Sequence, residues 1–312
     1  MRPIIVRLPN WVGDVVMALP AVSHVAQAGF TPQLVGKPWA TALLAGHGWD
    51  VHPRPGPLGA RVGQLRELQR RAADRDSGFD DRVNTLLLTN SFSSALEARL
   101  ARLRPLGYRQ DGRGWLLTVA VPVPSDPIHE SERFWRLAVA LTGVDRPQPH
   151  LLRLAVAPLA QQAADALLAR HAVGGDFACI VPFATGTLNG RSKAWPDFPA
   201  FAARLATRLP VIVVPGPTEA ALAREAYPAA LTLEGADLGV YAGLLKRARL
   251  VVSNDTGPGH LAAAVGAPLL SVLGPTDAVR YRPWGDHVTI VQADPWPTIE
   301  AVDAGVQRLL AG

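Results

Sequence analysis

The chain has 312 residues, of which 48% are hydrophobic and 18% are charged, the balance of an ordinary soluble globular protein. This length exceeds the ~100–200 residues of one common domain, so two domains are expected. The single cysteine, Cys179, lies in an apolar run and excludes both an internal disulfide and a zinc site of cysteine type.

The net charge of +5 belongs to the first half of the chain. Residues 1–150 contain 18 Lys and Arg against 13 Asp and Glu, whereas residues 151–312 contain 13 of each. An anionic partner of the first half, such as a phosphorylated substrate or a membrane surface, would explain this asymmetry. The alternative is an arginine-rich surface that is only solvated.

No targeting segment is expected at the start of the sequence, because the apolar run at residues 3–6 is interrupted by Arg7 and ends at Pro9 and Asn10. Residues 256–276 lack Asp, Glu, Lys and Arg, but their four glycines and three prolines argue against a membrane span. We therefore expect a cytoplasmic protein.

The first strand is expected at residues 4–8, followed by a turn and a helix through residues 15–17. Pro20 predicts that this helix is interrupted after less than two turns. Asp14 falls in the first helical turn, toward the carboxyl edge of the sheet, where open α/β sheets bind ligands. Its alternative role is to stabilise the helix N-terminus.

Strands at 33–36, 49–52 and 85–89 are expected to alternate with a loop at 56–63 and helices at 64–76 and 95–104. The polar segment 90–94, which includes Ser91, would cap the last helix. Arg109 and Arg113 follow in glycine-containing segments, and their guanidinium groups could hold an anionic acceptor by bidentate contacts. Ordinary surface salt bridges are the alternative for each arginine.

His129, Glu130 and Glu132 lie close together before a periodic helix at 134–142. Their spacing does not place two histidines on one helix face, so we interpret them as polar residues of a helix start and expect no metal site. The proline-containing segment 147–150 then interrupts the pattern and marks the domain boundary.

The second half begins with an expected helix at 158–171 and a strand at 178–182, followed by a loop at 183–196. This loop is rich in hydroxyl groups and glycine, and it suits phosphate oxygens, with Lys193 as a point charge. A strand at 210–215 precedes Glu219, which is either a ligand of ribose hydroxyls or a helix-start residue.

A βαβ unit is expected from a strand at 250–252, a helix at 260–265 and a strand at 269–273. Asn254, Asp255, Thr256 and Gly257 form the turn at the carboxyl end of the first strand, where a phosphate would suit the helix N-terminus. Thr276 follows the second strand. The alternative is that Asp255 or Thr256 only caps the helix.

A strand at 288–291 and a helix at 299–311 follow. Neither the dinucleotide motif G-x-G-x-x-G after the first strand nor a P-loop motif is present in the sequence.

Taken together, these segments resemble glycosyltransferase family 9, the ADP-heptose:lipopolysaccharide heptosyltransferases. The similar segments occur in the family's order and span nearly the whole chain, at residues 8–21, 90–96, 107–109, 112–115, 193–196, 254–257, 260 and 274–276. The first of them is most similar to the heptosyltransferase II branch. The chain departs from relatives in the longer loop at 188–192.

The resemblance implies an α/β protein of GT-B architecture, with two Rossmann-like doubly wound domains that face across a cleft. It places an acceptor-binding domain at residues 1–154 and a nucleotide-sugar-binding domain at residues 155–312, with the last helix, about 299–311, packed back on the first domain.

By the same resemblance, Asp14 is the general base and Lys193 the phosphate-binding lysine. The nucleotide-sugar site would consist of Thr185, Thr187, Lys193, Glu219, Asp255, Thr256, Gly257, His260 and Thr276. The acceptor site would include Asn10, Trp11, Ser91, Arg109 and Arg113.

The expected reaction is inverting transfer of a heptose from ADP-heptose to the lipopolysaccharide core or a similar anionic glycolipid, without a metal or other cofactor. Asp14 would accept the hydroxyl proton, and Lys193 with the turn at Thr256 would stabilise the departing diphosphate. The expected partners are the nucleotide-sugar donor, the glycolipid acceptor and the cytoplasmic face of the inner membrane, but no nucleic acid. Two alternatives stay open, a GT-B-fold nucleotide-sugar epimerase and a non-catalytic nucleotide-sugar-binding protein.

Overall fold

The computed structural model describes residues 2–184, 187–188 and 190–311. Contacts divide the chain into two compact units, Met1–Leu44 with Gly48–Pro149, and Ala45–His47 with His150–Gly312. The change from one unit to the other falls inside the proline-containing segment that the sequence indicates. Residues 150–154 group with the second unit, where the Leu154 N–H donates to the Ala264 carbonyl oxygen at 2.9 Å.

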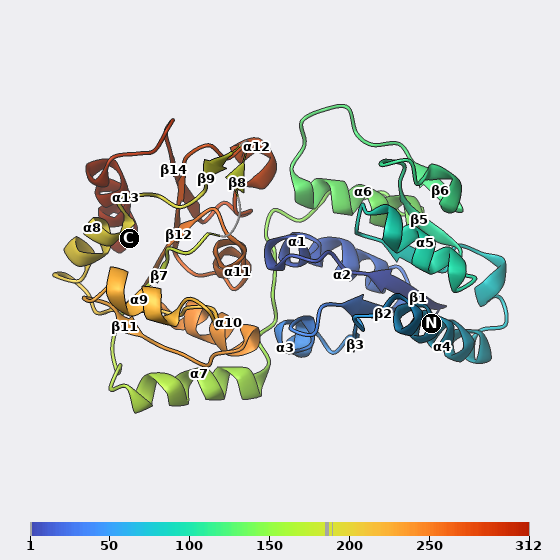
Figure 1. Ribbon diagram of the computed structural model, residues 1–312, viewed down its shortest axis with the longest axis horizontal. Helices are drawn as coiled ribbons and strands as arrows, with labels where there is room; N and C mark the ends of the chain where they lie inside the picture. Colours follow the sequence, from blue (N-terminus) through green and yellow to red (C-terminus); the bar gives the residue numbers. More distant parts are fainter. Residues whose placement is uncertain (1, 185–186, 189, 312) are drawn as a thin grey trace. The chain divides into compact units, whose positions relative to one another are not determined.

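The first unit is built on one parallel six-stranded sheet with the order β3-β2-β1-β4-β5-β6 (Figure 1). Its strands are β1 (Arg2–Arg7), β2 (Phe30–Gly36), β3 (Asp50–Pro53), β4 (Thr85–Leu87), β5 (Pro105–Tyr108) and β6 (Val119–Val121). Its helices are α1 (Val12–Met17), α2 (Leu19–Gln27), α3 (Ala40–Leu44), α4 (Leu58–Arg75), α5 (Phe92–Leu100) and α6 (Glu130–Thr142), with 3-10 turns η2 (Phe79–Asp81) and η3 (Gly114–Leu116). The strand order reverses between β1 and β4, so the loops after these two strands flank the ligand-binding position of a doubly wound sheet.

The helix after β1 is interrupted as the sequence predicts. α1 ends at Met17 and α2 begins at Leu19, with Pro20 in the first turn of α2. Proline is tolerated there because the first helical N–H groups have no intrahelical acceptor.

The expected loop at 56–63 is wrong, because α4 already begins at Leu58. Val62, Leu65 and Leu68 form a buried stripe at helical spacing, and they pack in the same core cluster as Ile5 of β1. This burial outweighs the helix-propensity cost of Gly59 and Gly63, which is about 1 kcal/mol for each glycine.

The second unit contains a second parallel six-stranded sheet, with the order β11-β10-β7-β12-β13-β14. Its strands are β7 (Ala178–Val181), β10 (Val211–Val213), β11 (Leu231–Thr232), β12 (Leu250–Asn254), β13 (Leu269–Leu273) and β14 (Val288–Gln292), and β8 (Thr187–Leu188) pairs antiparallel with β9 (Arg191–Ser192). Its helices are α7 (Pro158–Arg170), α8 (Phe198–Leu205), α9 (Ala220–Ala226), α10 (Leu238–Arg247), α11 (Gly257–Ala264), α12 (Ala278–Tyr281) and α13 (Ile299–Ala311), with the 3-10 turn η1 (Ala45–His47). In this sheet the order reverses between β7 and β12.

The core of the second unit joins its sheet to α8 and α13. Trp195, Phe198 and Phe201 are buried with ring centroids 5.6 to 6.3 Å apart. Val302 and Val306 of α13 belong to the same core cluster. α13 therefore packs in the core of the second unit, and its expected packing on the first domain stays a prediction.

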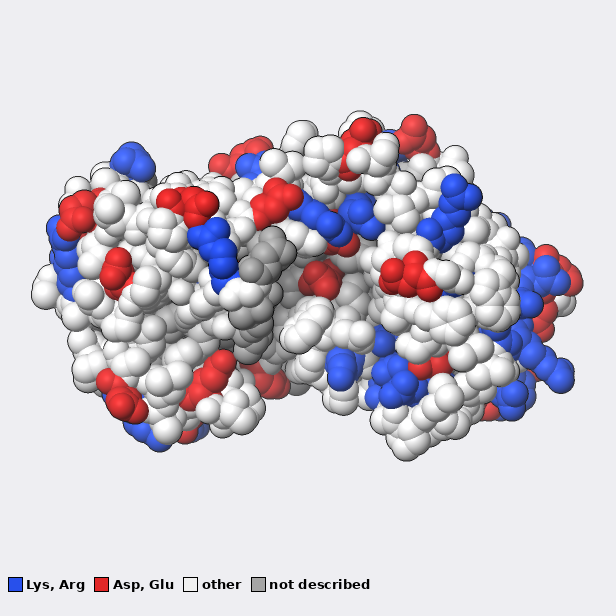
Figure 2. All heavy atoms as spheres, turned by 45° about the horizontal axis from the view of Figure 1, so that its top comes forward, with Lys and Arg blue, Asp and Glu red and all other residues white. Residues whose placement is uncertain are grey.

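Cys179 is fully buried in β7, as the sequence predicts, and burial raises the pKa of its thiol to about 12. Within the described part of the chain, no helix is both long enough and apolar enough to cross a membrane. On the face drawn in Figure 2, Lys and Arg side chains gather more densely over the first unit, at the right of the view, than over the second.

Candidate functional site

In the second unit, two loops that carry predicted site residues follow neighbouring strands. β7 and β12 pair in parallel, with Ile180 opposite Val252, and the order of the sheet reverses between them. The loop after β7 contains Lys193, and the turn after β12 contains Asp255. Because parallel strands end at the same edge, this fold brings the two side chains together at the position where doubly wound sheets bind ligands.

Lys193 and Asp255 form a direct ion pair. The Lys193 Nζ lies 2.6 Å from Asp255 Oδ2, and the side chain of Asp255 is only 5% exposed. The Thr276 hydroxyl, from the end of β13, donates to the same carboxylate oxygen at 2.7 Å. Three predicted residues, from the segments that follow β7, β12 and β13, therefore meet at the carboxylate of Asp255, which fixes the direction of the lysine.

The loop that carries Lys193 is anchored on both sides of the site. The Trp195 N–H donates to Asn254 Oδ1 at 3.2 Å, and Asn254 Nδ2 donates to the Pro182 carbonyl oxygen at 2.5 Å. The indole N–H of Trp195 donates to the Pro297 carbonyl oxygen at 3.1 Å. Asn254 thus links the loop after β7 to the end of β12, a positioning role that the sequence alone does not reveal.

The turn at Thr256 leads into α11 without a side-chain cap. Thr256 has extended backbone angles, but its hydroxyl makes no capping hydrogen bond. The carboxylate of Asp255 is occupied by Lys193 and Thr276. The alternative that these two residues only cap the helix is therefore not what the structure shows.

Gly259 allows α11 to approach the end of β12 closely. A Cβ atom at this position would lie 2.6 Å from Ser253 Oγ and 3.3 Å from the Asn254 carbonyl oxygen. Gly257 is the first residue of α11, so its N–H group has no acceptor within the helix. Such an N–H at a helix N-terminus favours a negatively charged ligand. His260, 4% exposed, is buried in the same first turns.

Glu219 lies after β10, the strand that pairs with the other side of β7. Its carboxylate accepts a hydrogen bond from the Gly216 N–H at 2.8 Å, and Glu219 is the residue directly before α9. This contact supports the helix-start role, while the ribose role stays a prediction. Thr185 lies outside the described residues, and of Thr187 only the backbone, in β8, is described.

In the first unit, Asp14 lies in the first turn of α1, directly after β1. It is half-buried between Gly13 and Val15, which are both buried. This position at the carboxyl edge agrees with a carboxylate that faces a ligand, and its catalytic role stays a prediction.

Asn10 and Trp11 line a pocket of about 610 Å³ at this edge. The other lining residues follow β1, β2 and β3 in turn, and they are Val12, Lys37, Trp39 and Arg54. The Asn10 side chain is fixed by Arg7, whose Nη2 donates to Asn10 Oδ1 at 2.7 Å. Trp11 is 69% exposed, which is unusual for so large an apolar side chain.

Behind this pocket lies an ion-pair cluster that the sequence analysis missed. Glu97 of α5 is 2% exposed and accepts hydrogen bonds from Arg54 Nη2 at 2.9 Å and Arg61 Nη1 at 3.0 Å. The sequence contained one indication of basic side chains at this edge. Lys37 and Arg54 each follow closely after a strand whose carboxyl end lies at this edge of the sheet.

The three other predicted acceptor residues differ in their surroundings. The Ser91 hydroxyl caps α5 by accepting from the Ser94 N–H at 3.3 Å, and the side chain of Arg109 is exposed. Arg113 is fully buried and donates to the carbonyl oxygens of Tyr108, Thr89 and Ser91 at 2.9, 2.6 and 3.3 Å. Burial lowers the pKa of Arg113 to about 10. Arg113 therefore holds the loops after β4 and β5 together, which supports a structural role for it.

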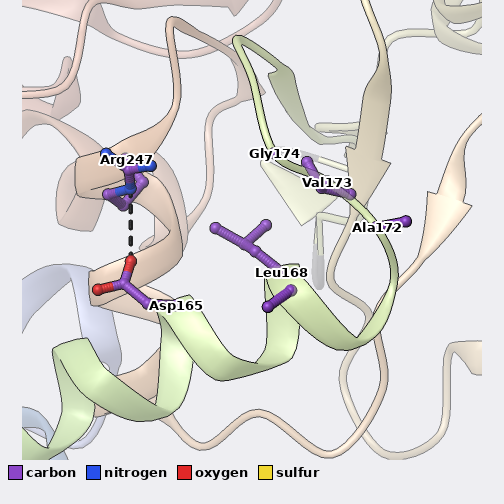
Figure 3. A pocket seen from close by; sticks show the side chains of 7 residues that line it. Asp165, Leu168, Ala172, Val173, Gly174 and Arg247 are labelled. Atoms are coloured by element: carbon purple, nitrogen blue, oxygen red, sulfur yellow. Dashed lines mark ion pairs between the residues drawn. The ribbon is translucent and has the colours of Figure 1, made fainter.

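A separate pocket of about 510 Å³ lies in the second unit (Figure 3). Asp165 and Arg247, which form an ion pair at 3.4 Å, line it together with Leu168 and residues 172–174. These residues precede β7 and β12, so this pocket lies at the amino edge of the sheet and contains none of the predicted site residues. Among the described residues there is no group of three His, Cys, Asp or Glu side chains that could hold a metal ion, and metal independence stays a prediction.

Residues 79–306 match the model of a family described as glycosyltransferase family 9 (heptosyltransferase). The chain is 26% identical to lipooligosaccharide heptosyltransferase 2 of Haemophilus ducreyi, over 97% of this chain and 90% of that protein. It is also 26% identical to lipopolysaccharide heptosyltransferase 2 of Salmonella typhimurium, over 88% of this chain and 83% of that protein.

The fold is similar to that of solved heptosyltransferases. ADP-heptose LPS heptosyltransferase II of E. coli superposes with a TM-score of 0.80 and 20% identity, covering 100% of this chain and 99% of that chain. E. coli heptosyltransferase WaaC, solved with ADP-2-deoxy-2-fluoro heptose, gives a TM-score of 0.69 and 22% identity, covering 99% of each chain. These similarities confirm the expected GT-B class of fold.

Proposed function

Because the chain belongs to glycosyltransferase family 9, we propose that it transfers a heptose from ADP-heptose to a lipopolysaccharide-core acceptor, with inversion at the anomeric carbon. The names of its relatives support this substrate pair, since the similar curated proteins are heptosyltransferases that act on lipooligosaccharide or lipopolysaccharide. The similar WaaC structure contains an ADP-heptose analogue.

The observation that carries the proposal is the group of Lys193, Asp255 and Thr276 beside the N-terminus of α11. In the proposed reaction the bond between the anomeric carbon and the diphosphate oxygen breaks, and the departing ADP takes the electron pair. The negative charge that develops is stabilised by the Lys193 ammonium group and by the backbone N–H groups of the turn at Gly257.

Asp255 tunes this arrangement by holding Lys193. The ion pair neutralises the lysine and fixes its direction. When the diphosphate binds, its oxygens compete with the carboxylate for the three ammonium hydrogens of Lys193. The lysine can donate to both partners. The buried carboxylate of Asp255 also keeps a second donor, because the Thr276 hydroxyl donates to it.

In the proposed reaction, Asp14 acts as the general base. A sugar hydroxyl is a weak nucleophile at neutral pH, and the carboxylate of Asp14 accepts its proton as the hydroxyl oxygen attacks the anomeric carbon from the face opposite the diphosphate. One C–O bond forms as the other breaks, which gives inversion. Since Lys193 and the N–H groups supply the positive charge, the proposed step needs no divalent ion.

Product analysis with a donor panel tests this function. The protein is incubated with ADP-, UDP-, GDP- and dTDP-linked sugars, with and without a heptose-deficient lipopolysaccharide core, and the products are analysed by mass spectrometry. We expect ADP release and an acceptor mass increase of one heptose only with ADP-heptose and acceptor together. Conversion of a nucleotide sugar without acceptor would support the epimerase alternative, and binding without turnover would support the non-catalytic one.

A further inference from the structure

The segments that follow β7 and β14 are joined at the carboxyl edge of the second sheet. Arg191, at the start of β9, forms an ion pair with Asp294, which lies shortly after β14. In the sheet, β12 and β13 stand between β7 and β14. Neighbouring strands lie roughly 4.8 Å apart, so the chain that leaves β7 crosses about 14 Å to reach the segment after β14. It therefore passes the ends of β12 and β13, which precede Asp255 and Thr276.

The segment that carries Asp294 packs closely on the end of β13. A Cβ atom at Gly274, the residue after β13, would lie 2.6 Å from the Pro295 carbonyl oxygen and 2.6 Å from the Cδ2 atom of Trp296. Only a glycine allows this approach without a shift of the backbone. Asp294 is thus part of a segment with a fixed position, and the ion pair holds Arg191 beside that segment.

The contacts that hold the loop after β7 differ in burial. Lys193 pairs with the carboxylate of Asp255, which is 5% exposed. Trp195 is 2% exposed and donates from both its backbone and its indole N–H group. The side chains of Arg191 and Asp294, in contrast, are 45% and 76% exposed. An exposed ion pair is weak because water solvates both partners, so this contact opens more readily than the buried ones.

Both partners of this ion pair are charged at neutral pH. The hydrogen bond from Arg191 lowers the pKa of Asp294, and the same hydrogen bond raises the pKa of Arg191. Their attraction is therefore present throughout the neutral pH range. Because both side chains are exposed, salt screens this attraction more strongly than it screens the buried pair of Lys193 and Asp255.

We propose that the ion pair of Arg191 and Asp294 is a strap that holds the loop of Lys193 across the ends of β12 and β13, and that this strap opens whenever a nucleotide enters or leaves. The inference rests on the proposed function, because that function assigns the nucleotide diphosphate to the group around Lys193. Arg191 and Asp294 are positioning residues, since they act through the loop and not by contact with the phosphates.

Stopped-flow fluorescence of the full chain with etheno-ADP tests the strap, because this analogue keeps the ribose and the diphosphate of ADP unchanged. Arg191→Gln and Asp294→Asn should each raise the association and release rate constants by roughly two- to fivefold, the factor that an exposed ion pair can supply. The dissociation constant should change less than either rate constant, because both rise together. Residues that only stabilised the fold would alter the affinity without making association faster.

Reversal of the two charges is the most specific part of the test. The double variant with Arg191→Asp and Asp294→Arg regains an ion pair of opposite polarity, so both rate constants should return to those of the unaltered protein. Asp165→Asn is the matched control, because it removes an exposed carboxylate whose ion pair with Arg247 lies at the amino edge of the same sheet. It should leave both rate constants unchanged. In about 1 M salt, where charges are screened beyond about 3 Å, the unaltered protein should approach the rate constants of Asp294→Asn.

Unchanged rate constants in both single variants, equal acceleration in Asp165→Asn, or a charge-reversed variant that stays as fast as Asp294→Asn would each overturn the proposal. Absence of etheno-ADP binding to the unaltered protein would overturn it too. The proposed function fails by a different measurement, absence of heptose transfer from ADP-heptose. A strap effect on nucleotide exchange without such transfer would leave the strap established and the substrate assignment wrong.

Discussion

The Nζ atom of Lys193 lies 2.6 Å from the Oδ2 atom of Asp255, although the two residues come from loops that follow different strands. This ion pair is the point where the two predicted phosphate-binding segments of the second unit meet. In the proposed function, a diphosphate would meet a lysine that is already oriented, at the reversal of strand order where doubly wound sheets bind ligands.

Lys193→Ala should weaken ADP binding by roughly tenfold or more, because a charge-assisted hydrogen bond to the diphosphate is lost. Isothermal titration calorimetry with ADP measures this effect. Lys246→Ala removes a lysine of α10 and serves as the control that should bind ADP like the unaltered protein. Equal affinity in Lys193→Ala and the control would place the diphosphate elsewhere.

Gly259→Ala should lower the free energy of unfolding by about 1–3 kcal/mol, the usual cost of overpacking. The added Cβ would lie 2.6 Å from Ser253 Oγ, so α11 must shift away from β12. Gly63→Ala in α4 is the matched control, since nothing lies within 4 Å of its Cβ position and alanine favours a helix. Denaturant unfolding should show destabilisation in the first variant and none in the second; the opposite order would mean that the close approach of α11 is not required.

Glu97→Ala should destabilise the first unit strongly. The substitution leaves Arg54 and Arg61 without their shared carboxylate. Breaking a buried ion pair in this way costs about 3–5 kcal/mol. We expect the lower end of this range, because both guanidinium groups retain some solvent access. Glu67→Ala, which removes an exposed carboxylate of α4, is the control and should change stability far less than Glu97→Ala. Similar unfolding midpoints for the two variants would contradict the role of Glu97.

His24 should make stability fall as the pH decreases from 7 to 5. Its side chain is 1% exposed, and burial, together with the charge of Arg146, lowers its pKa below the usual 6.5. Below pH 6.5 the unfolded chain therefore binds this proton more readily than the folded chain, so the stabilisation present above that pH is lost as the pH falls toward the folded pKa. The melting temperature of His24→Gln should fall less between pH 7 and pH 5 than that of the unaltered protein. An identical fall in both would show that His24 does not contribute.

The sequence predicts the parts of this molecule that depend on local pattern. The alternation of strands and helices, the interruption at Pro20 and the turn at Asp255 follow from periodicity and from the residues that begin and end helices. The start of α4 is not predicted, because Gly59 and Gly63 suggest a loop and only the tertiary burial of Val62 and Leu65 makes this segment helical.

The acceptor side of the site shows where sequence patterns stop being informative. Arg109 and Arg113 look alike in the sequence, yet one is exposed and the other is fully buried against backbone carbonyl oxygens. Conversely, Arg54 and Glu97 are 43 residues apart, and no local pattern indicates that they pair. The burial of each arginine and the pairing of Arg54 with Glu97 both depend on how strands and helices pack. Such packing cannot be read from a local sequence pattern.

The most direct test of the proposed mechanism is the rate of heptose transfer by Asp14→Asn, measured with ADP-heptose and a heptose-deficient core acceptor. The substitution keeps the shape of the side chain and removes the base, so kcat should fall by ~10²–10⁴-fold while calorimetry shows unchanged ADP affinity. Transfer by Asp14→Asn at nearly the rate of the unaltered protein would contradict the account.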